Sequence, residues 1–334
     1  MKQLNAGIIG FGLSGSVFHA PFLHTHPRFN LTKIVERTSH ASQETYPYIE
    51  VVKDYKALLE DNELDLIVIG TPNIWHYPMV KESLLAGKHV VVEKPFTPAT
   101  QEATELIDIS EKVNKKIFVY HNRRWDGDFL TVKKLLAENT LGDIKEYEVH
   151  FDRYAPDIKE NWRDQELLGS GILYDLGSHL IDQAIHLFGI PNKIKSTIEA
   201  QRIDSPVDDY FRIELEYTNG LKAILTAGML VKKLGPRFII EGSKGSFIKY
   251  GIDPQEADLK EGQMPNTKDW GKEKEENWGT ININDTNNKI ETIAGNYMGF
   301  YDNVYDAIVN DKEIFIKPEE AKDVIKIIEM AKDN

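Results

Sequence analysis

The stretch Ala6-Gly7-Ile8-Ile9-Gly10-Phe11-Gly12-Leu13-Ser14-Gly15 decides the fold of the first part of this chain. Ala6 to Ile9 is a short apolar segment of the kind that forms a buried strand. It runs directly into G-x-G-x-x-G and then into Ser16 to His24, which we expect to be helical. The first glycine permits a tight turn, the second lets the backbone approach a pyrophosphate, and the third lets helix and strand pack closely. The alternative is a glycine-rich turn without a ligand, because the hexapeptide alone is a weak signal.

An acidic residue at the expected distance favours a dinucleotide site. Glu36 ends the predicted strand Leu31 to Val35, about 20 residues after the glycines, where a carboxylate usually binds the ribose. Arg37, Thr38 and Ser39 follow, and a guanidinium with hydroxyl neighbours can bind a 2′-phosphate instead, unless it is a solvated surface residue. Glu36 therefore favours NAD and Arg37 favours NADP, and we expect NADP with NAD as the alternative. The residues assigned to the cofactor are Gly10, Phe11, Gly12, Leu13, Ser14, Gly15, Glu36, Arg37 and Thr38.

Strands and helices alternate through the first third of the chain. The apolar segments Leu64 to Ile69 and Val90 to Val92 indicate strands that are buried on both faces of a sheet. Repeated strand–helix units of this kind predict a doubly wound parallel sheet. The other elements predicted here are helices over 56–60, 75–86 and 98–113 and a strand over 116–120.

Charged and polar residues follow two of these buried strands. Glu93 and Lys94 follow Val90 to Val92 and so lie at the carboxyl end of the strand, where open α/β sheets bind their ligands. Pro95 ends the strand because it has no N–H to donate. A lysine at this place is poorly suited to a core and well suited to a ligand site. We also assign three residues after the neighbouring strand to the cofactor side, with a plain polar turn as the alternative, namely Thr71, Pro72 and Asn73.

The second part of the chain has the alternation of antiparallel strands. Strands are predicted over 147–151, 193–201, 210–217, 222–227, 237–241 and 246–250, and helices over 126–138, 297–309 and 318–330. These elements predict an α+β domain with an open, mostly antiparallel sheet, over 122–334, after a nucleotide-binding domain over 1–121. The helix 318–330 is free to pack back on the first domain. Residues 251–290 are polar and are interpreted as a long surface excursion that Trp270 and Trp278 pin down in part.

An open sheet needs a cover on its outer face, which a second copy of the chain can supply. We therefore expect a homodimer or homotetramer formed through this sheet.

Composition excludes several classes of function. A chain of 334 residues exceeds the usual size of a single core, so two domains are expected. The net charge of -13 argues against nucleic acid and anionic membranes as partners, since both call for a basic patch. The absence of cysteine removes disulfides, thiolate nucleophiles and cysteine zinc sites. No signal peptide and no apolar run of bilayer length is recognised, so we expect a cytoplasmic protein.

Asp175 and His179 form a second candidate constellation. They are four residues apart on a predicted helix and share one face, and Asp182 and His186 continue the same stripe. One interpretation is acid–base catalysis, in which a carboxylate orients the histidine and a lysine such as Lys94 offsets alkoxide charge. The second is a structural Asp–His pair. The third is a metal site, which we do not expect, because Lys94 would repel the ion and no third ligand is evident.

Three motifs together resemble the glucose–fructose oxidoreductase/inositol dehydrogenase/MocA family, namely the loop Gly10 to Gly15, the block Ala86 to Pro95 and the pair Asp175 and His179. They occur in the family's order, and the resemblance covers nearly the whole chain. Several stretches look like the branch that contains NADP-dependent scyllo-inositol dehydrogenases, namely Gly12 to Pro21, Tyr120 to Asp126, Arg153-Tyr154, Trp162-Arg163, Tyr174 to Gln183 and Phe247 to Asp253. The chain departs from the pattern at Glu36, where relatives carry a small hydroxyl residue.

The resemblance implies a Rossmann domain, a domain with an open-faced antiparallel sheet, and an active site in the cleft between them. It implies that Lys94 lies between nicotinamide and substrate, with Pro95 often cis in the family. His179 would be the acid/base and Asp175 its companion at the substrate. Further cofactor residues implied are His76, Glu93, Lys94, Asn122, Trp162 and Arg163, and the substrate residues implied are Lys94, Arg124, Tyr154, Asp175 and His179.

These observations together predict an NAD(P)-dependent oxidoreductase. It would transfer a hydride between nicotinamide and a hydroxyl or carbonyl of a sugar or cyclic polyol, with scyllo-inositol as the specific candidate. One alternative is a dinucleotide-sensing regulatory protein of the same fold, although such relatives tend to lose the lysine or the Asp–His pair. The other is an NAD-dependent glycosidase, which oxidises and then re-reduces its sugar.

Overall fold

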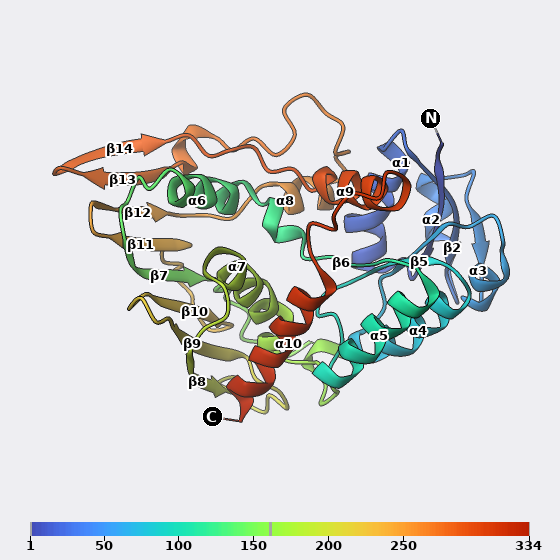
Figure 1. The fold of residues 1–334 in the computed structure, drawn as a ribbon, viewed down its shortest axis with the longest axis horizontal. Helices are drawn as coiled ribbons and strands as arrows, with labels where there is room; N and C mark the ends of the chain where they lie inside the picture. The colour runs from blue at the N-terminus through green and yellow to red at the C-terminus, as the bar shows by residue number, and fades with distance from the viewer. Residues whose placement is uncertain (1, 160–161, 334) are drawn as a thin grey trace. The chain divides into compact units, whose positions relative to one another are not determined.

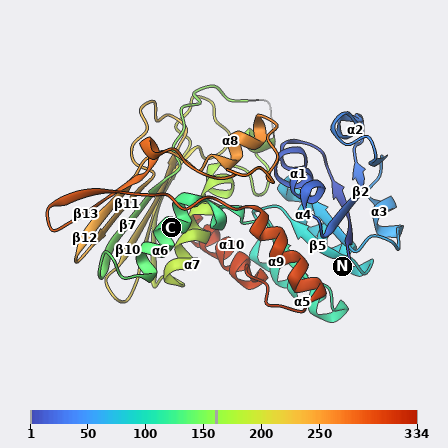
Figure 2. The same cartoon turned by 90° about the horizontal axis from the view of Figure 1, so that it is seen from above.

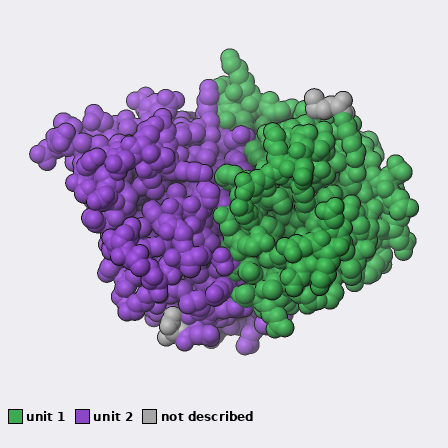
Figure 3. Space-filling model, in the orientation of Figure 1, with its two compact units in different colours: residues 1–122, 255–270, 297–322 green, residues 123–254, 271–296, 323–334 purple. Residues whose placement is uncertain are grey.

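The structure is a computed structural model that describes residues 2–159 and 162–333, apart from the side chain of Arg163. These residues form two compact units, shown in Figure 3. Unit 1 comprises 1–122, 255–270 and 297–322, and unit 2 comprises 123–254, 271–296 and 323–334. Two later segments thus belong to the same unit as the N-terminal part. The continuous domains 1–121 and 122–334 stay a prediction, because compactness alone does not show which segments fold independently.

Unit 1 contains a six-stranded parallel sheet in the order β3-β2-β1-β4-β5-β6. Figure 1 labels three of these strands, β2, β5 and β6. Every residue of β4 is buried, as expected for an apolar strand inside a parallel sheet. The strand order reverses between β1 and β4, which is the switch point where doubly wound sheets bind ligands. The sheet confirms the predicted fold class. Its strands are β1 (Leu4–Ile9), β2 (Phe29–Val35), β3 (Glu50–Val52), β4 (Leu66–Ile69), β5 (His89–Val92) and β6 (Ile117–Val119).

The helices predicted over 56–60, 75–86, 98–113 and 297–309 are confirmed, and α4 lies beside α5 in Figure 1. The predicted helical segment 16–24 is confirmed, but it is divided into a π-helix and a short α-helix. Pro21 explains the break, since it has no N–H to continue an α-helical ladder from the preceding turn. The helices are η1 (Ser14–His19), α1 (Ala20–Thr25), α2 (Ala41–Thr45), α3 (Lys56–Glu60), η2 (Asn73–Trp75), α4 (His76–Leu85), α5 (Thr100–Val113), α8 (Gln255–Lys260) and α9 (Met298–Val309).

Unit 2 contains an eight-stranded sheet in the order β14-β13-β12-β11-β7-β10-β9-β8. Among the described strands of this sheet, only β7 and β10 pair in parallel, so the mostly antiparallel sheet is confirmed. The strands are β7 (Ile144–His150), β8 (Lys193–Glu199), β9 (Tyr210–Glu216), β10 (Lys222–Gly228), β11 (Phe238–Gly242), β12 (Gly245–Lys249), β13 (Gly279–Ile283) and β14 (Thr286–Ile290).

The prediction that residues 251–290 form only a surface excursion is wrong, because β13 and β14 extend the sheet. The strand β14 is polar and almost fully exposed, so it lacks the apolar alternation that identifies a strand. Asn284 and Asp285 connect the two strands, both with positive φ, as in the two-residue hairpin turns that match strand twist. Trp270 and Trp278 do fix parts of this region, since their indole N–H groups donate to Gln255 and to the backbone carbonyl of Glu273.

Two helices of unit 2, α6 (Gly127–Ala137) and α7 (Ser178–Phe188), lie on the same side of the sheet (Figure 2). Alternate residues of β9 face them and are buried, namely Phe211, Ile213 and Leu215. The opposite face carries ion pairs, among them Lys195–Glu214 and Arg212–Glu148. In the described part of unit 2 that face has no helical cover (Figure 2). The remaining helices are η3 (Asn122–Trp125), η4 (Trp162–Asp164), η5 (Leu173–Gly177), η6 (Glu275–Asn277) and α10 (Pro318–Lys332).

None of the helices in the described ranges combines the length and the apolar character that crossing a bilayer requires.

Candidate functional site

The three glycines of the turn after β1 play different steric roles. Gly10 has a φ of +94°, which residues with a side chain rarely adopt, so glycine permits the turn here. A Cβ at Gly15 would lie 2.1 Å from the carbonyl oxygen of Gly10, so only glycine fits there. A Cβ at Gly12 would meet nothing within 4 Å, so the backbone of Gly12 borders open space. The positive φ of Gly10 agrees with its predicted role in the turn, and the open side of Gly12 leaves room for a pyrophosphate, whose binding there stays a prediction.

The Glu93 carboxylate joins this turn to the end of β5. Its Oε1 accepts a hydrogen bond from the Ser14 hydroxyl (2.5 Å) and lies 3.1 Å from His19 Nε2. Its Oε2 accepts the backbone N–H of Lys94 (3.1 Å). Burial alone would raise the pKa of Glu93, but the bonds from His19 and Ser14 lower it to about 2. The ionised carboxylate therefore ties the glycine turn to the backbone that carries Lys94.

His19 continues this network to α9. Its Nδ1 lies 2.7 Å from the hydroxyl of Tyr301. Burial raises the pKa of Tyr301, so the hydroxyl keeps its proton. The ionised Glu93 carboxylate can only accept, so Nε2 of His19 donates to it. A chain of hydrogen bonds thus links Tyr301, His19 and Glu93, entirely within unit 1.

Glu36 lies directly after β2, but its carboxylate is bound internally. Its Oε1 accepts the backbone N–H (3.0 Å) and the hydroxyl of Ser42. Its Oε2 accepts the backbone N–H of Ala41 (2.9 Å) and the hydroxyl of Ser39. The residue is 5% exposed. Glu36 therefore stabilises the first turn of α2, and a contact between it and a ribose stays a prediction.

Arg37 and Thr38 have the opposite environment, since both are exposed. No hydrogen bond or ion pair to another described residue involves the Arg37 side chain. A guanidinium without an acidic partner is available to an anion from solution.

The loops after β4 and β5 are joined by His76. Its Nδ1 lies 2.8 Å from the carbonyl oxygen of Pro95 and its Nε2 lies 3.0 Å from that of Thr71. Burial lowers the pKa of His76, and the contacts of its two ring nitrogens with the carbonyl oxygens oppose that effect. The peptide bond between Lys94 and Pro95 is cis, as the family resemblance implied. Asn73 is buried in η2, and Pro72 and Lys94 are partly exposed.

Asp175 and His179 lie where a π-helix gives way to an α-helix in unit 2. Asp175 is on η5 and partly exposed, whereas His179 is in the first turn of α7 and 5% exposed. Asp208 positions this segment, because its carboxylate accepts the backbone N–H of Leu173 (2.8 Å). A Cβ at Gly171 would lie 2.2 Å from the same carboxylate, and its φ is +89°. The segment from Gly171 to Leu173 therefore packs closely against the Asp208 carboxylate, and Asp175 follows two residues later.

Arg124 is held by two residues of α7. Its Nε and Nη2 donate to the two carboxylate oxygens of Asp182 at 2.8 and 2.7 Å, and its Nη1 lies 3.0 Å from His186. Arg124 as a whole residue is 1% exposed. Asp182 and His186, which the sequence placed on one stripe with His179, thus bind Arg124 and fix η3 to α7. A contact between Arg124 and a substrate stays a prediction.

The other predicted site residues differ in how far they are buried. Asn122 is buried at the start of η3, Trp162 is partly exposed in η4, and Tyr154 is half exposed. The Tyr154 backbone pairs with Leu230, and Lys232 lies over its ring at 5.4 Å. The prediction for Arg163 falls on a side chain outside the described part of the chain.

Sequence reasoning missed several positioning residues, namely His19, Ser42, Asp208 and Tyr301. His19 lies in the stretch Gly12 to Pro21 that carries the family resemblance. The sequence thus shows a histidine in this motif but does not show that Glu93 and Tyr301 are its hydrogen-bond partners. Tyr301 is 282 residues further along the chain, and no periodicity or spacing connects the two.

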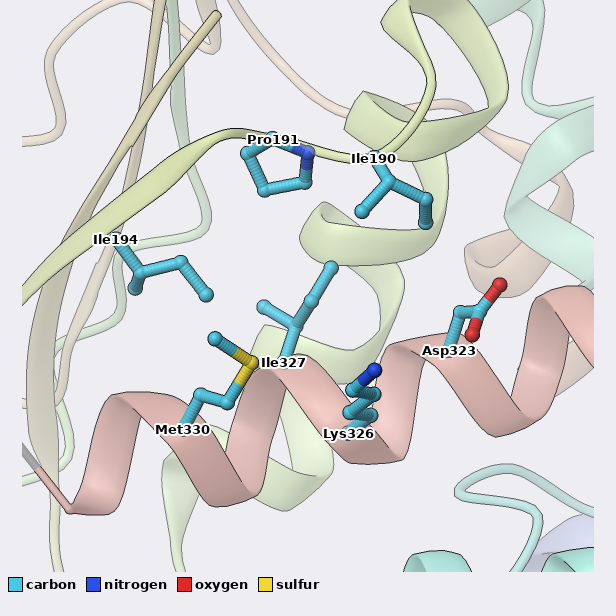
Figure 4. Close-up of a pocket in the computed structure, with 7 residues that line it drawn as sticks. All are labelled: Ile190, Pro191, Ile194, Asp323, Lys326, Ile327 and Met330. Carbon is cyan, nitrogen blue, oxygen red and sulfur yellow. The ribbon is translucent and has the colours of Figure 1, made fainter.

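A separate surface depression in unit 2 lies between the α7–β8 connection and α10 (Figure 4). It is lined by Ile190, Pro191, Ile194, Asp323, Lys326, Ile327 and Met330. None of the predicted site residues lines it, and most of its lining is apolar. We assign it no chemistry. Among the described residues, no group of three or more His, Asp or Glu side chains is arranged to hold a metal ion.

Comparisons with known proteins agree with this geometry. Residues 4–121 match the family described as "Oxidoreductase family, NAD-binding Rossmann fold" and residues 133–333 match "Oxidoreductase family, C-terminal alpha/beta domain". The scyllo-inositol 2-dehydrogenase (NADP(+)) of Bacillus subtilis is 40% identical over 338 residues, covering 100% of this chain and 94% of that protein.

Two solved structures are also similar over almost the whole length. An oxidoreductase of Bacillus subtilis has a TM-score of 0.96 at 38% identity, covering 99% of this chain and 96% of that one. An oxidoreductase of Bacteroides fragilis has a TM-score of 0.91 at 43% identity, covering 99% and 97%.

The buried position of the Glu93 charge predicts an acid-sensitive stability. Because its folded pKa is depressed from 4.5 to about 2, it contributes stability above pH 4.5 that is lost as the pH falls towards 2. Glu93→Gln should lower the free energy of unfolding at pH 7 by about 1–3 kcal/mol and weaken this acid dependence. Urea unfolding at pH 7 and at steps below pH 4.5 measures both effects.

The control for this experiment is Glu60→Gln, which removes the same charge from an exposed residue of α3. It should leave the unfolding free energy and its acid dependence unchanged. Identical unfolding curves for Glu93→Gln and Glu60→Gln would show that the Glu93 network contributes nothing to stability.

Proposed function

Because the chain belongs to the Gfo/Idh/MocA oxidoreductase family, we propose that it is an NAD(P)-dependent dehydrogenase of a sugar or cyclic polyol. The specific substrate we propose is scyllo-inositol, on the strength of the relative from Bacillus subtilis that is named for it. The observation that carries the proposal is the Glu93 network, which fixes Lys94 to the glycine turn that fits a pyrophosphate. We propose NADP as the preferred cofactor, since Arg37 is exposed and Glu36 is bound internally.

In this proposal three side chains act on one substrate. A nicotinamide cofactor held at the turn Gly10 to Gly15 would supply the acceptor or donor of the hydride. His179 takes the hydroxyl proton during oxidation and returns it during reduction, and Asp175 orients the substrate or the imidazole. The Lys94 ammonium binds the reacting oxygen and offsets the negative charge that develops as its proton leaves. The hydride and the proton leave the same CH–OH group, so the two transfers account for all atoms and electrons.

A substrate panel tests the proposal. Purified protein is assayed with NAD⁺ and with NADP⁺ against scyllo-inositol, myo-inositol, glucose and related aldoses, following nicotinamide absorbance. We expect reduction of NADP⁺ with at least one polyol and slower reduction of NAD⁺. Nucleotide binding without turnover of any substrate would favour a sensing protein, and hydrolysis of glycosides by dialysed protein without added nucleotide would favour a glycosidase.

Lys94→Ala tests the proposed role of the lysine. It should lower kcat by about a hundredfold or more, the usual effect of losing a positioned acid–base or electrostatic group. The affinity for NADP⁺, measured by calorimetry, should change far less, because the pyrophosphate contacts remain. Lys112→Ala in α5 is a matched control at an exposed position and should leave both values unchanged. Turnover of Lys94→Ala within a few-fold of wild type would remove Lys94 from the mechanism.

We also propose that the protein works in the cytoplasm as a homodimer or homotetramer, assembled through the helix-free face of the unit 2 sheet. Support for this assembly comes from the lack of a helical cover on that face, where the exposed cations Lys195 and Arg212 pair with partly exposed carboxylates. Light scattering after size-exclusion chromatography should give a mass of two or four chains. A monomer mass at micromolar concentration would exclude the assembly.

A further inference from the structure

The Glu36 carboxylate has no lone pair left for a ligand. A carboxylate offers about four acceptor positions, two on each oxygen. Here Oε1 accepts two hydrogen bonds from Ser42, and Oε2 accepts one from Ala41 and one from Ser39. Two of the four donors are backbone N–H groups and two are side-chain hydroxyls. A ribose hydroxyl could bind Glu36 only by displacing one of them.

These four bonds also explain how a glutamate is tolerated at this buried position. A buried charge without hydrogen bonds would be strongly destabilising. Burial raises the pKa of Glu36, but the bonds from Ser39 and Ser42, together with the two backbone bonds, lower it overall. The carboxylate is therefore ionised at neutral pH and held towards α2.

The position of Glu36 matters because a carboxylate after the second strand usually selects NAD. Such a residue binds the ribose 2′-hydroxyl and repels a 2′-phosphate. In this chain the carboxylate is saturated by its own loop, while the adjacent Arg37 is exposed and forms no hydrogen bond or ion pair with another described residue. A glutamate at this position usually favours NAD, whereas here its environment favours NADP.

We propose that Ser39 and Ser42 determine cofactor specificity by binding the Glu36 carboxylate, which leaves Arg37 to bind the 2′-phosphate of NADP. The inference rests on the proposed function, since it concerns the nucleotide of the same site. Removing the two hydroxyls frees one acceptor position on each carboxylate oxygen. The freed carboxylate then binds the 2′-hydroxyl of NAD⁺ and repels the phosphate of NADP⁺.

The test measures binding of each nucleotide by calorimetry, without any substrate. The quantity of interest is the ratio of the Kd for NAD⁺ to the Kd for NADP⁺. We expect a ratio above one for wild type and a decrease of about tenfold or more in Ser39→Ala/Ser42→Ala, since 1.4 kcal/mol of new repulsion has that effect. Adding Glu36→Gln to this variant should restore most of the ratio, because the repelling charge is then absent.

The combined variants separate this mechanism from a direct one. If the serine hydroxyls bound the phosphate themselves, the ratio would fall equally with Glu36 and with Gln at position 36, and the inference would be wrong. An unchanged ratio in Ser39→Ala/Ser42→Ala, or a wild-type ratio of one, would also contradict it. Wild-type protein that binds neither nucleotide would overturn the proposed function and this inference with it.

Two further variants control for charge and folding. Glu44→Gln removes a carboxylate from the same short helix at an exposed position and should leave the ratio unchanged. If the double serine variant does not fold, as judged by thermal unfolding, Ser39→Ala alone replaces it, because Ser39 is exposed and supplies only one of the four bonds. Its ratio should fall less than in the double variant, but still measurably, and no fall would count against the inference.

Discussion

The buried carboxylate of Glu93 is the interaction on which the arrangement of unit 1 depends. It receives the Ser14 hydroxyl from the glycine turn, the imidazole of His19 and the backbone N–H of Lys94. Because an ionised carboxylate is unfavourable in a core without such donors, the three segments have to stay in place together. The glycine turn and the lysine are thus fixed to each other through one side chain.

Glu36 repeats this arrangement at the end of β2. Both glutamates directly follow strands of the parallel sheet, and both are satisfied by donors of unit 1. Both are also followed by a basic residue that is more exposed. Acidic residues at these positions would be expected to bind the ligand themselves. In this chain they hold the loops, and their neighbours, Arg37 and Lys94, are the groups that we propose meet the ligand.

The sequence predicted the parallel sheet and the mostly antiparallel second sheet because apolar runs and alternation depend on local burial, as in β4 and β9. It did not predict β14, whose residues are polar and exposed, nor the π-helices at Ser14–His19 and Leu173–Gly177. Both π-helices lie in the motifs singled out for chemistry, where such helices are frequent. The hydrogen-bond partners of Glu36 and Glu93 could not be predicted either. The spacing of residues in the sequence shows neither the direction of a side chain nor a contact as distant as that of His19 with Tyr301.

The central claim is that the chain transfers a hydride directly between a substrate carbon and a nicotinamide. The most direct measurement uses a polyol substrate that carries deuterium on the oxidised carbon, with NADP⁺ and the purified protein, and locates the label by mass spectrometry and NMR. The account predicts one deuterium on the nicotinamide ring of every reduced cofactor. Reduced cofactor without deuterium, or deuterium recovered in the water, would contradict it.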